Sequence, residues 1–324
     1  MNPSNAARLL ELEVVDRRLL TADVLALWLR RADHGLLPAA APGSHLEIDV
    51  LIDGRSERRC YSIVNASLTP HAYEIGVKLE VSGKGGSRYM HQLALGARLA
   101  SSEPRNGFEL FDGPHEAVLI AGGIGITPIL SMVRTLQARE APYTLHYGAR
   151  SAQAMAYREE ILGHFASRSK LYFDDGVAEA GMKLRDVLGE PSSARHAYVC
   201  GPRPLLDATL HEARNLGWDL DHVHFELFGA PSPATGDGPI SLTLARSGRI
   251  IEVAADASIL DAMIEAGCDP MFDCKRGECS VCALKVLDGI ADHRDYVLSE
   301  EDRLQGLLCV CVSRARTPQL TLDA

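Results

Sequence analysis

The sequence of 324 residues predicts a multidomain chain in which a β domain, an α/β domain and an α+β domain follow one another. Up to about residue 113, Pro and Gly turns break up short apolar stretches, a pattern typical of an antiparallel barrel. Strand and helix signals then alternate to about residue 228, which favours a parallel α/β sheet. The next eleven residues are mostly Gly, Pro and Ser, so we expect a linker. The expected boundaries are 1–113, 114–228, 229–239 for the linker, and 240–324.

The composition is ordinary for a globular protein, with 46% hydrophobic and 23% charged residues. A formal net charge of -10 argues against binding to nucleic acid or to an anionic membrane surface through bulk charge. No run of about 18 apolar residues occurs, and the first residues lack the apolar stretch of a signal peptide. We therefore expect a cytoplasmic protein with no membrane span and with reduced cysteines.

The strands and helices of the first two domains can be placed approximately. In the first domain, residues 46–52 and 73–78 have the clearest strand patterns. In the second domain, strands are expected at residues 117–121, 143–147, 170–173 and 196–200, and helices from residue 128, at about 156–165 and after residue 200.

A glycine-rich turn, G-G-I-G-I-T-P, follows the first strand of the α/β domain. Gly122, Gly123 and Gly125 lack the Cβ atoms that would keep a pyrophosphate away from the backbone N–H groups. Thr127 is the expected N-cap of the next helix and Pro128 its first residue, and such a helix N-terminus favours an anion. The turn differs from the Rossmann G-x-G-x-x-G motif, and a tight turn without a ligand is the alternative.

A second strand of the same domain ends at the side where open parallel sheets bind ligands, and two such ends make a crevice. The residues at this second end are Cys200, Gly201 and Pro202. Asp174 and Asp175 follow the third strand, where a carboxylate accepts hydrogen bonds from ribose hydroxyls and repels a 2′-phosphate. The two aspartates favour NADH over NADPH. Arg150, at the end of another strand, favours NADPH instead.

The C-terminal domain begins with a hairpin over residues 240–253, with its turn at Gly248. A helix is expected from the N-cap Ser258 to about residue 266, and Gly267 is the expected stop.

Three cysteines with C-x4-C-x2-C spacing come directly after that helix, and a fourth follows near the C-terminus. The first three are Cys274, Cys279 and Cys282. This spacing holds a plant-type [2Fe-2S] cluster, and Gly277 suits the tight loop because glycine accepts a positive φ. Zinc usually takes two C-x2-C pairs or Cys/His pairs, so zinc and unliganded thiols are the weaker alternatives. The residues alone leave the fourth ligand open, because Cys309 and Cys311 would share one face of a strand.

Several motifs occur together in one order, and they extend nearly from end to end. They are R-C-Y-S at 59–62, G-K-G-G-S at 83–87, the glycine turn, C-G-P at 200–202, F-E-L-F-G at 225–229, the cysteine motif, A-D-H-R-D at 291–295 and C-V-S-R-A at 311–315. On these motifs the chain resembles the phthalate dioxygenase reductase family. The resemblance implies an FMN-binding antiparallel β-barrel, a parallel α/β domain that binds NADH, and a C-terminal β-grasp domain of the plant-type ferredoxin kind. It also implies that electrons pass from NADH to FMN, to the [2Fe-2S] cluster and then to a separate Rieske-type oxygenase.

The resemblance also implies roles for single residues around the flavin. Arg59 would neutralise the FMN phosphate, and Tyr61 would lie along the isoalloxazine. Thr127 would lie where flavin and nicotinamide meet. The other implied contacts with the flavin are Ser62, Val77, Lys78, Gly85, Gly86, Ser87, Phe225 and Phe228.

For the cluster, the resemblance makes Cys311 the fourth ligand, because it stands immediately before V-S-R-A, and leaves Cys309 as a buried thiol. Ser280 departs from the glycine that relatives commonly have. Lys275 and Arg276 add a positive pair beside the cluster, and nearby charge moves iron-sulfur potentials.

No side-chain acid, base or nucleophile is expected, because the hydride passes between cofactors. His293 is expected to be a polar link or a solvated side chain. The alternative functions are a reductase for another acceptor, such as an O-demethylase or a hydroxylase, and a redox-sensing flavoprotein. FAD is disfavoured because the first domain shows no adenosine-binding signal, and a monomer is expected.

Overall fold

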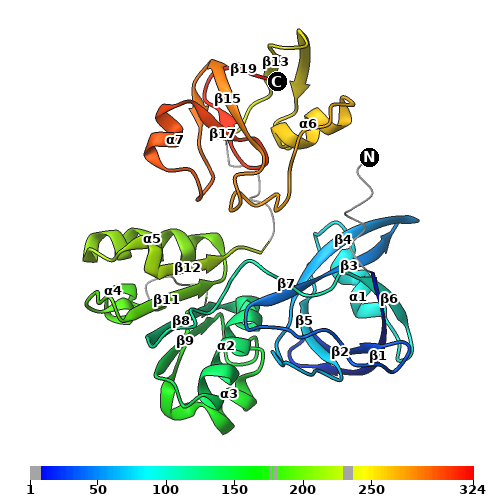
Figure 1. Ribbon diagram of the computed structural model, residues 1–324, viewed down its shortest axis with the longest axis vertical. Coiled ribbons are helices and arrows are strands. Elements are labelled where there is room, and N and C mark those ends of the chain that lie inside the picture. The colour runs from blue at the N-terminus through cyan, green and yellow to red at the C-terminus, as the bar shows by residue number, and fades with distance from the viewer. Residues whose placement is uncertain (1–8, 176, 178–180, 229–235) are drawn as a thin grey trace. The chain divides into compact units, whose positions relative to one another are not determined.

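The computed structural model describes residues 9–175, 177, 181–228 and 236–324 (Figure 1). The chain divides into two compact units, Met1–Glu226 and Leu227–Ala324. The first unit contains an antiparallel sheet and a parallel sheet, and the second contains a mixed sheet. Residues 229–235 of the expected linker lie outside the described residues. None of the helices in the described part of the chain has the length and apolar character needed to cross a bilayer.

The antiparallel sheet has the strand order β4-β3-β6-β1-β2-β5, with β7 paired to β3. Its strands are β1 (Leu10–Leu19), β2 (Val24–Arg31), β3 (Ser44–Ile52), β4 (Arg55–Ser62), β5 (Tyr73–Lys78), β6 (Arg98–Ser101) and β7 (Arg105–Asn106). The terminal strands β4 and β5 meet at an isolated bridge between Ile63 and Ile75, which closes the sheet into a barrel. Leu46 and Ile48 point into the barrel core while Glu47 between them points outward, as a period of two requires. Helix α1 (Gly86–Gln92) packs on β3 and β5, and the predicted antiparallel barrel is confirmed.

The second sheet of this unit is parallel throughout, in the order β10-β9-β8-β11-β12. Its strands are β8 (Glu116–Gly122), β9 (Tyr143–Ala149), β10 (Ser169–Phe173), β11 (Arg195–Cys200) and β12 (Val223–Glu226). In Figure 1, α2 (Ile126–Ala138) and α3 (Arg158–His164) cover one face, and α4 (Leu184–Leu188) and α5 (Arg203–Leu216) cover the other. Because helices cover both faces, β8 is an almost continuous buried apolar run. The predicted parallel α/β sheet is confirmed.

The predicted start of α2 is wrong by two residues. A 3₁₀ turn at Gly123–Gly125 leads directly into the helix, so Gly125 is the N-cap and Thr127 is the second helical residue. The hydroxyl of Thr127 donates to the carbonyl oxygen of Ile124 at 3.1 Å instead of capping the helix. The glycine turn already has helical curvature, so the helix begins without a side-chain cap.

The barrel and the parallel sheet share a hydrophobic core, in which Val64 and Phe108 pack with buried residues of α2. Nearby, Arg134 of α2 donates to Glu74 of β5 and to Glu160 of α3, each at 2.8 Å. Glu74 is only 4% exposed and the Arg134 side chain 26% exposed, so the carboxylate of Glu74 is buried against a partly buried arginine. It joins the helix after the glycine turn to a terminal strand of the barrel.

The second unit has a five-stranded mixed sheet in the order β14-β13-β19-β15-β17 and a two-stranded ribbon of β16 and β18. Its elements are β13 (Ile240–Leu244), β14 (Arg249–Val253), α6 (Ile259–Glu265), β15 (Ala283–Asp288), β16 (Ala291–Asp292), α7 (Glu300–Leu304), β17 (Leu307–Cys309), β18 (Arg314–Ala315) and β19 (Gln319–Leu322). The predicted hairpin is confirmed as β13 and β14. Ser258 caps α6 by accepting from the N–H of Asp261 at 3.0 Å, and Gly267 follows the helix with φ +76°, both as predicted.

Candidate functional site

Five of the residues that are expected to contact the flavin lie on β4 and β5, the terminal strands of the barrel. They are Arg59, Tyr61 and Ser62 on β4, and Val77 and Lys78 on β5. The two strands meet at the bridge between Ile63 and Ile75. Stepping outward from this bridge in antiparallel register, Tyr61 comes opposite Val77. The structure therefore brings both groups of residues to one seam of the barrel, which we call the β4–β5 seam.

Arg59 lies against the first residues of α1. A Cβ atom on Gly86 would lie 2.9 Å from Nε of Arg59, so glycine leaves room for this side chain. Gly85 has φ +98°, a conformation that favours glycine, and Ser87 accepts a backbone hydrogen bond at 2.9 Å that fixes the loop. Arg59 also pairs with Glu57 at 2.6 Å. A guanidinium beside an open glycine backbone is a suitable place for a phosphate group.

Ser62 is a buried polar residue at the same seam. It is 4% exposed, and within the described residues its Oγ has no hydrogen-bond partner. Buried hydroxyls normally have one, so this Oγ fits a ligand with polar ring atoms. Burial raises the pKa of Tyr61 well above its usual value against the opposing charge of Arg59, so the phenol stays neutral. The seam thus offers an aromatic surface, an unpaired hydroxyl and a cation, which together fit FMN.

The glycine turn of the parallel sheet reaches this seam through Thr127. A Cβ atom on Gly76 of β5 would lie 2.7 Å from Cγ2 of Thr127 and 3.3 Å from the hydroxyl of Tyr157. Thr127 is 1% exposed. The first turn of α2 therefore packs directly on the strand that also carries Val77.

The ends of β8 and β11 pack closely because glycines stand on both sides. A Cβ atom on Gly122 would lie 2.8 Å from Cδ of Pro202, and one on Gly201 would lie 3.0 Å from Cα of Gly122. A Cβ atom on Gly125 would overlap the carbonyl oxygen of Cys200. These glycines are therefore required for the two strand ends to pack against each other.

Gly123 differs from its neighbours in the turn. It has φ +55°, and a Cβ atom there would meet nothing within 4 Å. Its carbonyl oxygen accepts a hydrogen bond from the hydroxyl of Tyr147 at 3.0 Å, which holds the turn in place. Of the three glycines in the turn, Gly123 is the one whose backbone faces open space.

Gly125→Ala is expected to separate the two strand ends, because the new methyl group would overlap the carbonyl of Cys200. We expect weaker NADH binding and a loss of about 1–3 kcal/mol in the free energy of unfolding of the first unit. NADH titration and urea unfolding measure the two effects. Gly163→Ala in α3 is the matched control, since a Cβ there meets nothing within 4 Å and should leave NADH binding unchanged. Wild-type stability and affinity in Gly125→Ala would disprove the packing role.

The other residues expected at the nucleotide or flavin occupy separate places. Asp174 and Asp175 follow β10, and their N–H groups donate to the carbonyls of Ala149 and Arg150 at 3.3 and 2.9 Å. Phe225 lies on β12 in the first unit. Phe228 belongs to the second unit and is 40% exposed.

The cysteines of the C-x4-C-x2-C motif lie in the loop between α6 and β15, and Cys311 comes just after β17. The pairing of β15 with β17 continues to a hydrogen bond from the N–H of Val310 to the carbonyl of Cys282 at 3.4 Å, which places Cys282 beside both Cys309 and Cys311. Cys274 lies close to Cys311 and Cys279, and Cys282 lies close to both Cys309 and Cys311. The neighbouring thiol of Cys311 is the largest cause that lowers the pKa of Cys274 to about 4. A lowered pKa favours the thiolate that metal ligation requires.

The four cysteines can be compared with a tetrahedral zinc site. A tetrahedral zinc site with Zn–S bonds of about 2.3 Å would bring all its sulfurs within about 4 Å of one another. Among the described residues, the group of three or more possible ligand atoms that all lie within 4.8 Å of one another is that of His45, Glu47 and Cys60 on the barrel. In the described part of the chain the four cysteine sulfurs do not form such a group, so their arrangement differs from a compact tetrahedral zinc site.

The expectation that Cys309 and Cys311 share one face of a strand is wrong. β17 ends at Cys309, and the chain then turns, with the N–H of Ser313 donating to the carbonyl of Cys309 at 3.0 Å. Cys311 contacts both Cys274 and Cys282, whereas Cys309 contacts Cys282. The turn therefore gives Cys309 and Cys311 different surroundings. Sequence periodicity could not predict this difference.

The cysteine loop bends through left-handed backbone at three residues. These are Lys275 with φ 53°, Gly277 with φ 79° and Ser280 with φ 57°. At Gly277 a Cβ atom would also lie 2.8 Å from Cγ2 of Val312 and 3.1 Å from Cα of Asp295. Left-handed backbone costs a non-glycine residue about 1–2 kcal/mol, so Ser280 strains the loop.

Gly277→Ala is expected to lower the iron content of the purified protein, because both the backbone and the space around Gly277 exclude a methyl group. Ser280→Gly in the same loop should retain full iron and stabilise the second unit by about 1–2 kcal/mol. Iron analysis and thermal bleaching of the visible absorption measure both variants. Equal iron retention by the two would show that the loop tolerates a Cβ at Gly277.

The positive pair beside the cluster is neutralised by partners that the sequence did not reveal. Arg276 pairs with Glu278 at 2.8 Å, and Lys275 pairs with Asp261 at 2.9 Å. Glu278 also accepts the N–H of Leu227 at 2.7 Å. Burial raises the pKa of Glu278, and Arg276 opposes that rise. Both positive charges are thus locally compensated.

Asp295 is a second buried carboxylate of this unit. It accepts from the N–H of Leu298 at 3.0 Å and from the hydroxyl of Ser313 at 3.4 Å. Nδ1 of His293 lies 3.6 Å from it without a hydrogen bond to any described residue, and the His293 side chain is 20% exposed, so the expected solvated side chain is wrong. The N–H of Tyr296 donates to the carbonyl of Gly277 at 3.0 Å, which ties this segment to the cysteine loop.

Comparison with known proteins agrees with this arrangement. A 2Fe-2S iron-sulfur cluster binding domain matches residues 242–316, and an oxidoreductase NAD-binding domain matches residues 119–211. The chain is 40% identical over 304 residues to the phenoxybenzoate dioxygenase subunit beta of Ectopseudomonas oleovorans, covering 93% of each chain. It is 35% identical over 319 residues to a vanillate O-demethylase oxidoreductase of a Pseudomonas species, covering 97% of this chain and 100% of the relative.

Among solved structures, phthalate dioxygenase reductase aligns with a TM-score of 0.75 and 32% identity, over 98% of both chains. The cofactors are NADH, FMN and a [2Fe-2S] cluster. The chain therefore belongs to the phthalate dioxygenase reductase family, and it is an NADH-dependent iron-sulfur oxidoreductase that serves as the reductase component of an oxygenase system.

Proposed function

We propose that the electron acceptor of this reductase is a separate Rieske-type oxygenase. The observation that supports the chain's part in this transfer is the packing of Thr127 against Gly76, where the nucleotide turn meets the β4–β5 seam. Bound at this seam, FMN would supply the change from two-electron hydride chemistry to single-electron transfer towards the cluster. The chain itself has to hold the cofactors in line, and no side chain needs to exchange a proton for the hydride transfer.

At the seam, we assign the FMN phosphate to Arg59 and to the backbone of the loop at Gly85, Gly86 and Ser87. The close approach of Arg59 to Gly86 supports this assignment. Tyr61, Ser62, Val77 and Lys78 would line the ring, and the hydroxyl of Ser62 would gain a polar partner there.

At the crevice, we assign the pyrophosphate of NADH to the backbone at Gly123. The packed glycines Gly122, Gly125 and Gly201 would shape the crevice, with Cys200 and Pro202 at its second strand end. Asp174 and Asp175 would bind the ribose hydroxyls. Phe225 and Phe228 would flank the flavin.

In the second unit, we assign the cluster to Cys274, Cys279, Cys282 and Cys311. The contacts of Cys311 with two other ligands support its choice over Cys309.

We also propose domain boundaries at residues 113, 228 and 239, and a cytoplasmic monomer of 35.1 kDa. Light scattering should give this mass, and twice the value would contradict a monomer.

The acceptor is tested by mixing the purified chain with NADH and a purified Rieske-type oxygenase without oxygen. Reduction of the Rieske centre, followed by its visible spectrum, should require this chain and should fail with Cys274→Ser. Failure with several such oxygenases, while another acceptor is reduced rapidly, would contradict the proposal.

O-demethylation is the second candidate for the partner's reaction, because one relative is named a vanillate O-demethylase oxidoreductase. Product analysis with methoxylated and unmethoxylated aromatic acids separates the two.

A further inference from the structure

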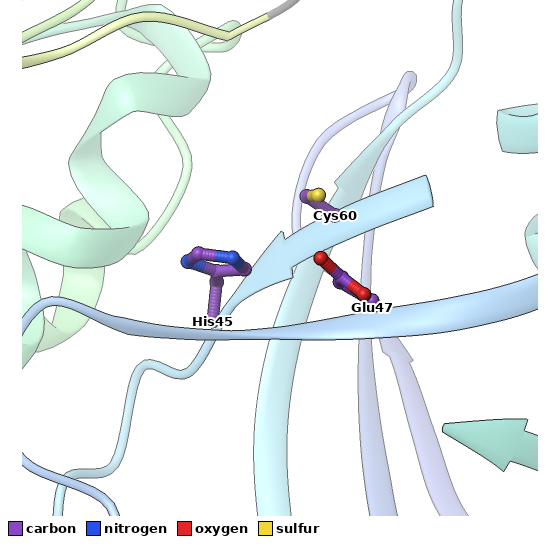
Figure 2. Close-up of side chains that lie close together, drawn as sticks. All are labelled: His45, Glu47 and Cys60. Atoms are coloured by element: carbon purple, nitrogen blue, oxygen red, sulfur yellow. The ribbon is translucent and has the colours of Figure 1, made fainter. Parts of the chain in front are cut away.

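We propose that His45, Glu47 and Cys60 form a binding site for a divalent transition metal ion of the zinc type, on the outer face of the barrel. One ligand atom from each residue, an imidazole nitrogen, a carboxylate oxygen and Sγ, lies within 4.8 Å of the other two. Figure 2 shows His45 and Glu47 rising from one strand toward Cys60 on the next. The site uses none of the residues assigned to FMN, NADH or the cluster.

The strand register explains why these side chains meet. His45 and Glu47 are two residues apart on β3, so they point to the same face. Glu47 is directly opposite Cys60 on β4. The intervening Leu46 is buried in the barrel core, and its partner Tyr61 packs against that core from the same side. The ligands therefore stand on a hydrogen-bonded pair of strands rather than on a loop, which limits their movement.

The donor set indicates which metal is favoured. Imidazole nitrogen, thiolate sulfur and carboxylate oxygen are all zinc ligands, at bond lengths of about 2.0–2.3 Å. Calcium and magnesium prefer oxygen ligands alone. Three protein ligands leave a fourth tetrahedral position for water. On binding, the thiol of Cys60 releases its proton to solvent, and one thiolate and one carboxylate then balance the 2+ charge.

Two arginines beside Glu47 bear on this site. Arg105 contacts Oε1 of Glu47 at 3.0 Å, and Arg58 contacts Oε2 at 3.5 Å. Their side chains are 45% and 56% exposed, so each pair contributes little and can rearrange. Oε2 has the weaker of the two pairs and is the oxygen available to a metal. Arg105 would then hold the other oxygen and orient the carboxylate.

The test uses the purified protein with its flavin and cluster. Equilibrium dialysis against Zn²⁺, followed by metal analysis, should show one zinc per chain beyond the iron of the cluster, with a micromolar or tighter dissociation constant. Cys60→Ser and Glu47→Gln should each weaken this site by at least about tenfold, since even changes around metal ligands cost 10–100-fold. Cys268→Ser is the matched control, because Cys268 is a partly exposed cysteine outside the site. X-ray absorption at the zinc edge should show one sulfur and otherwise nitrogen or oxygen neighbours.

Three results would overturn the proposal. The first is equal zinc affinity in the wild-type protein and in both variants. The second is no zinc uptake by the wild-type protein below millimolar concentration. The third is zinc uptake that tracks loss of iron, which would place the metal in the cluster site. Iron content and the visible circular dichroism of the cluster are therefore followed in every sample.

Discussion

Cys274→Ser is expected to leave the chain without its cluster while the flavin still reacts with NADH. Cys274 lies close to Cys279 and Cys311, so its replacement removes the cluster ligand that has two other ligands as neighbours. Reduction of one-electron acceptors that need the cluster should fall by more than the roughly 10–100-fold that changes around metal ligands cause. NADH-driven bleaching of the flavin should stay near the wild-type rate. Iron analysis and stopped-flow absorbance measure the two effects separately.

Cys309→Ser is the matched control for that experiment. Cys309 is buried and touches Cys282, yet the turn after β17 separates it from Cys311. It should keep the cluster, whereas Cys311→Ser should lose it. Loss of iron in Cys309→Ser with retention in Cys311→Ser would reassign the fourth ligand. Loss of flavin reduction in a folded Cys274→Ser protein would contradict separate roles for the two units.

Arg134→Met is expected to destabilise the first unit by about 3–5 kcal/mol, the usual cost of removing one partner from a buried ion pair. Arg134 forms two hydrogen bonds with Glu160 and one with Glu74, all at 2.8 Å. The methionine fills similar space but leaves the buried carboxylate of Glu74 without its cation. Urea unfolding followed by tryptophan fluorescence measures the loss, because Trp28 and Trp218 both lie in the first unit.

Arg139→Met at the end of the same helix is the matched control. Arg139 is half exposed and contacts the exposed Asp112 at 3.4 Å, so its replacement should change stability by less than about 0.5 kcal/mol. Thermal bleaching of the cluster should be unchanged in both variants. An equal loss of stability in both would mean that the buried ion pair has no special role. Arg134→Lys should recover part of the loss, because a single ammonium cannot reproduce the bidentate contact.

Local patterns were sufficient for most of the fold. The apolar run before Gly122 and the Pro and Gly turns of the barrel have short-range causes, and so have the Ser258 cap and the Gly267 stop. The cysteine spacing likewise depends on a single loop. These features could be predicted because the residues that determine them are neighbours in the sequence.

Features that depend on distant residues could not be predicted in the same way. Arg134 and Glu74 are 60 positions apart, and nothing around either residue indicates its partner. The approach of Gly125 to Cys200 gives that glycine a packing role that a turn motif alone does not reveal. Thr127 does not cap the helix, because the 3₁₀ turn before it extends the helical curvature. Periodicity failed for Cys311 because β17 ends two residues earlier.

The most direct test of the account is the electron paramagnetic resonance signal of the reduced cluster after anaerobic addition of NADH, measured with and without the flavin. The holoprotein should show the signal of a reduced [2Fe-2S] centre at about one spin per chain. Protein stripped of flavin should show it with dithionite but not with NADH, and added FMN should restore the response. A cluster that NADH reduces equally well without flavin would contradict the proposed order of electron transfer.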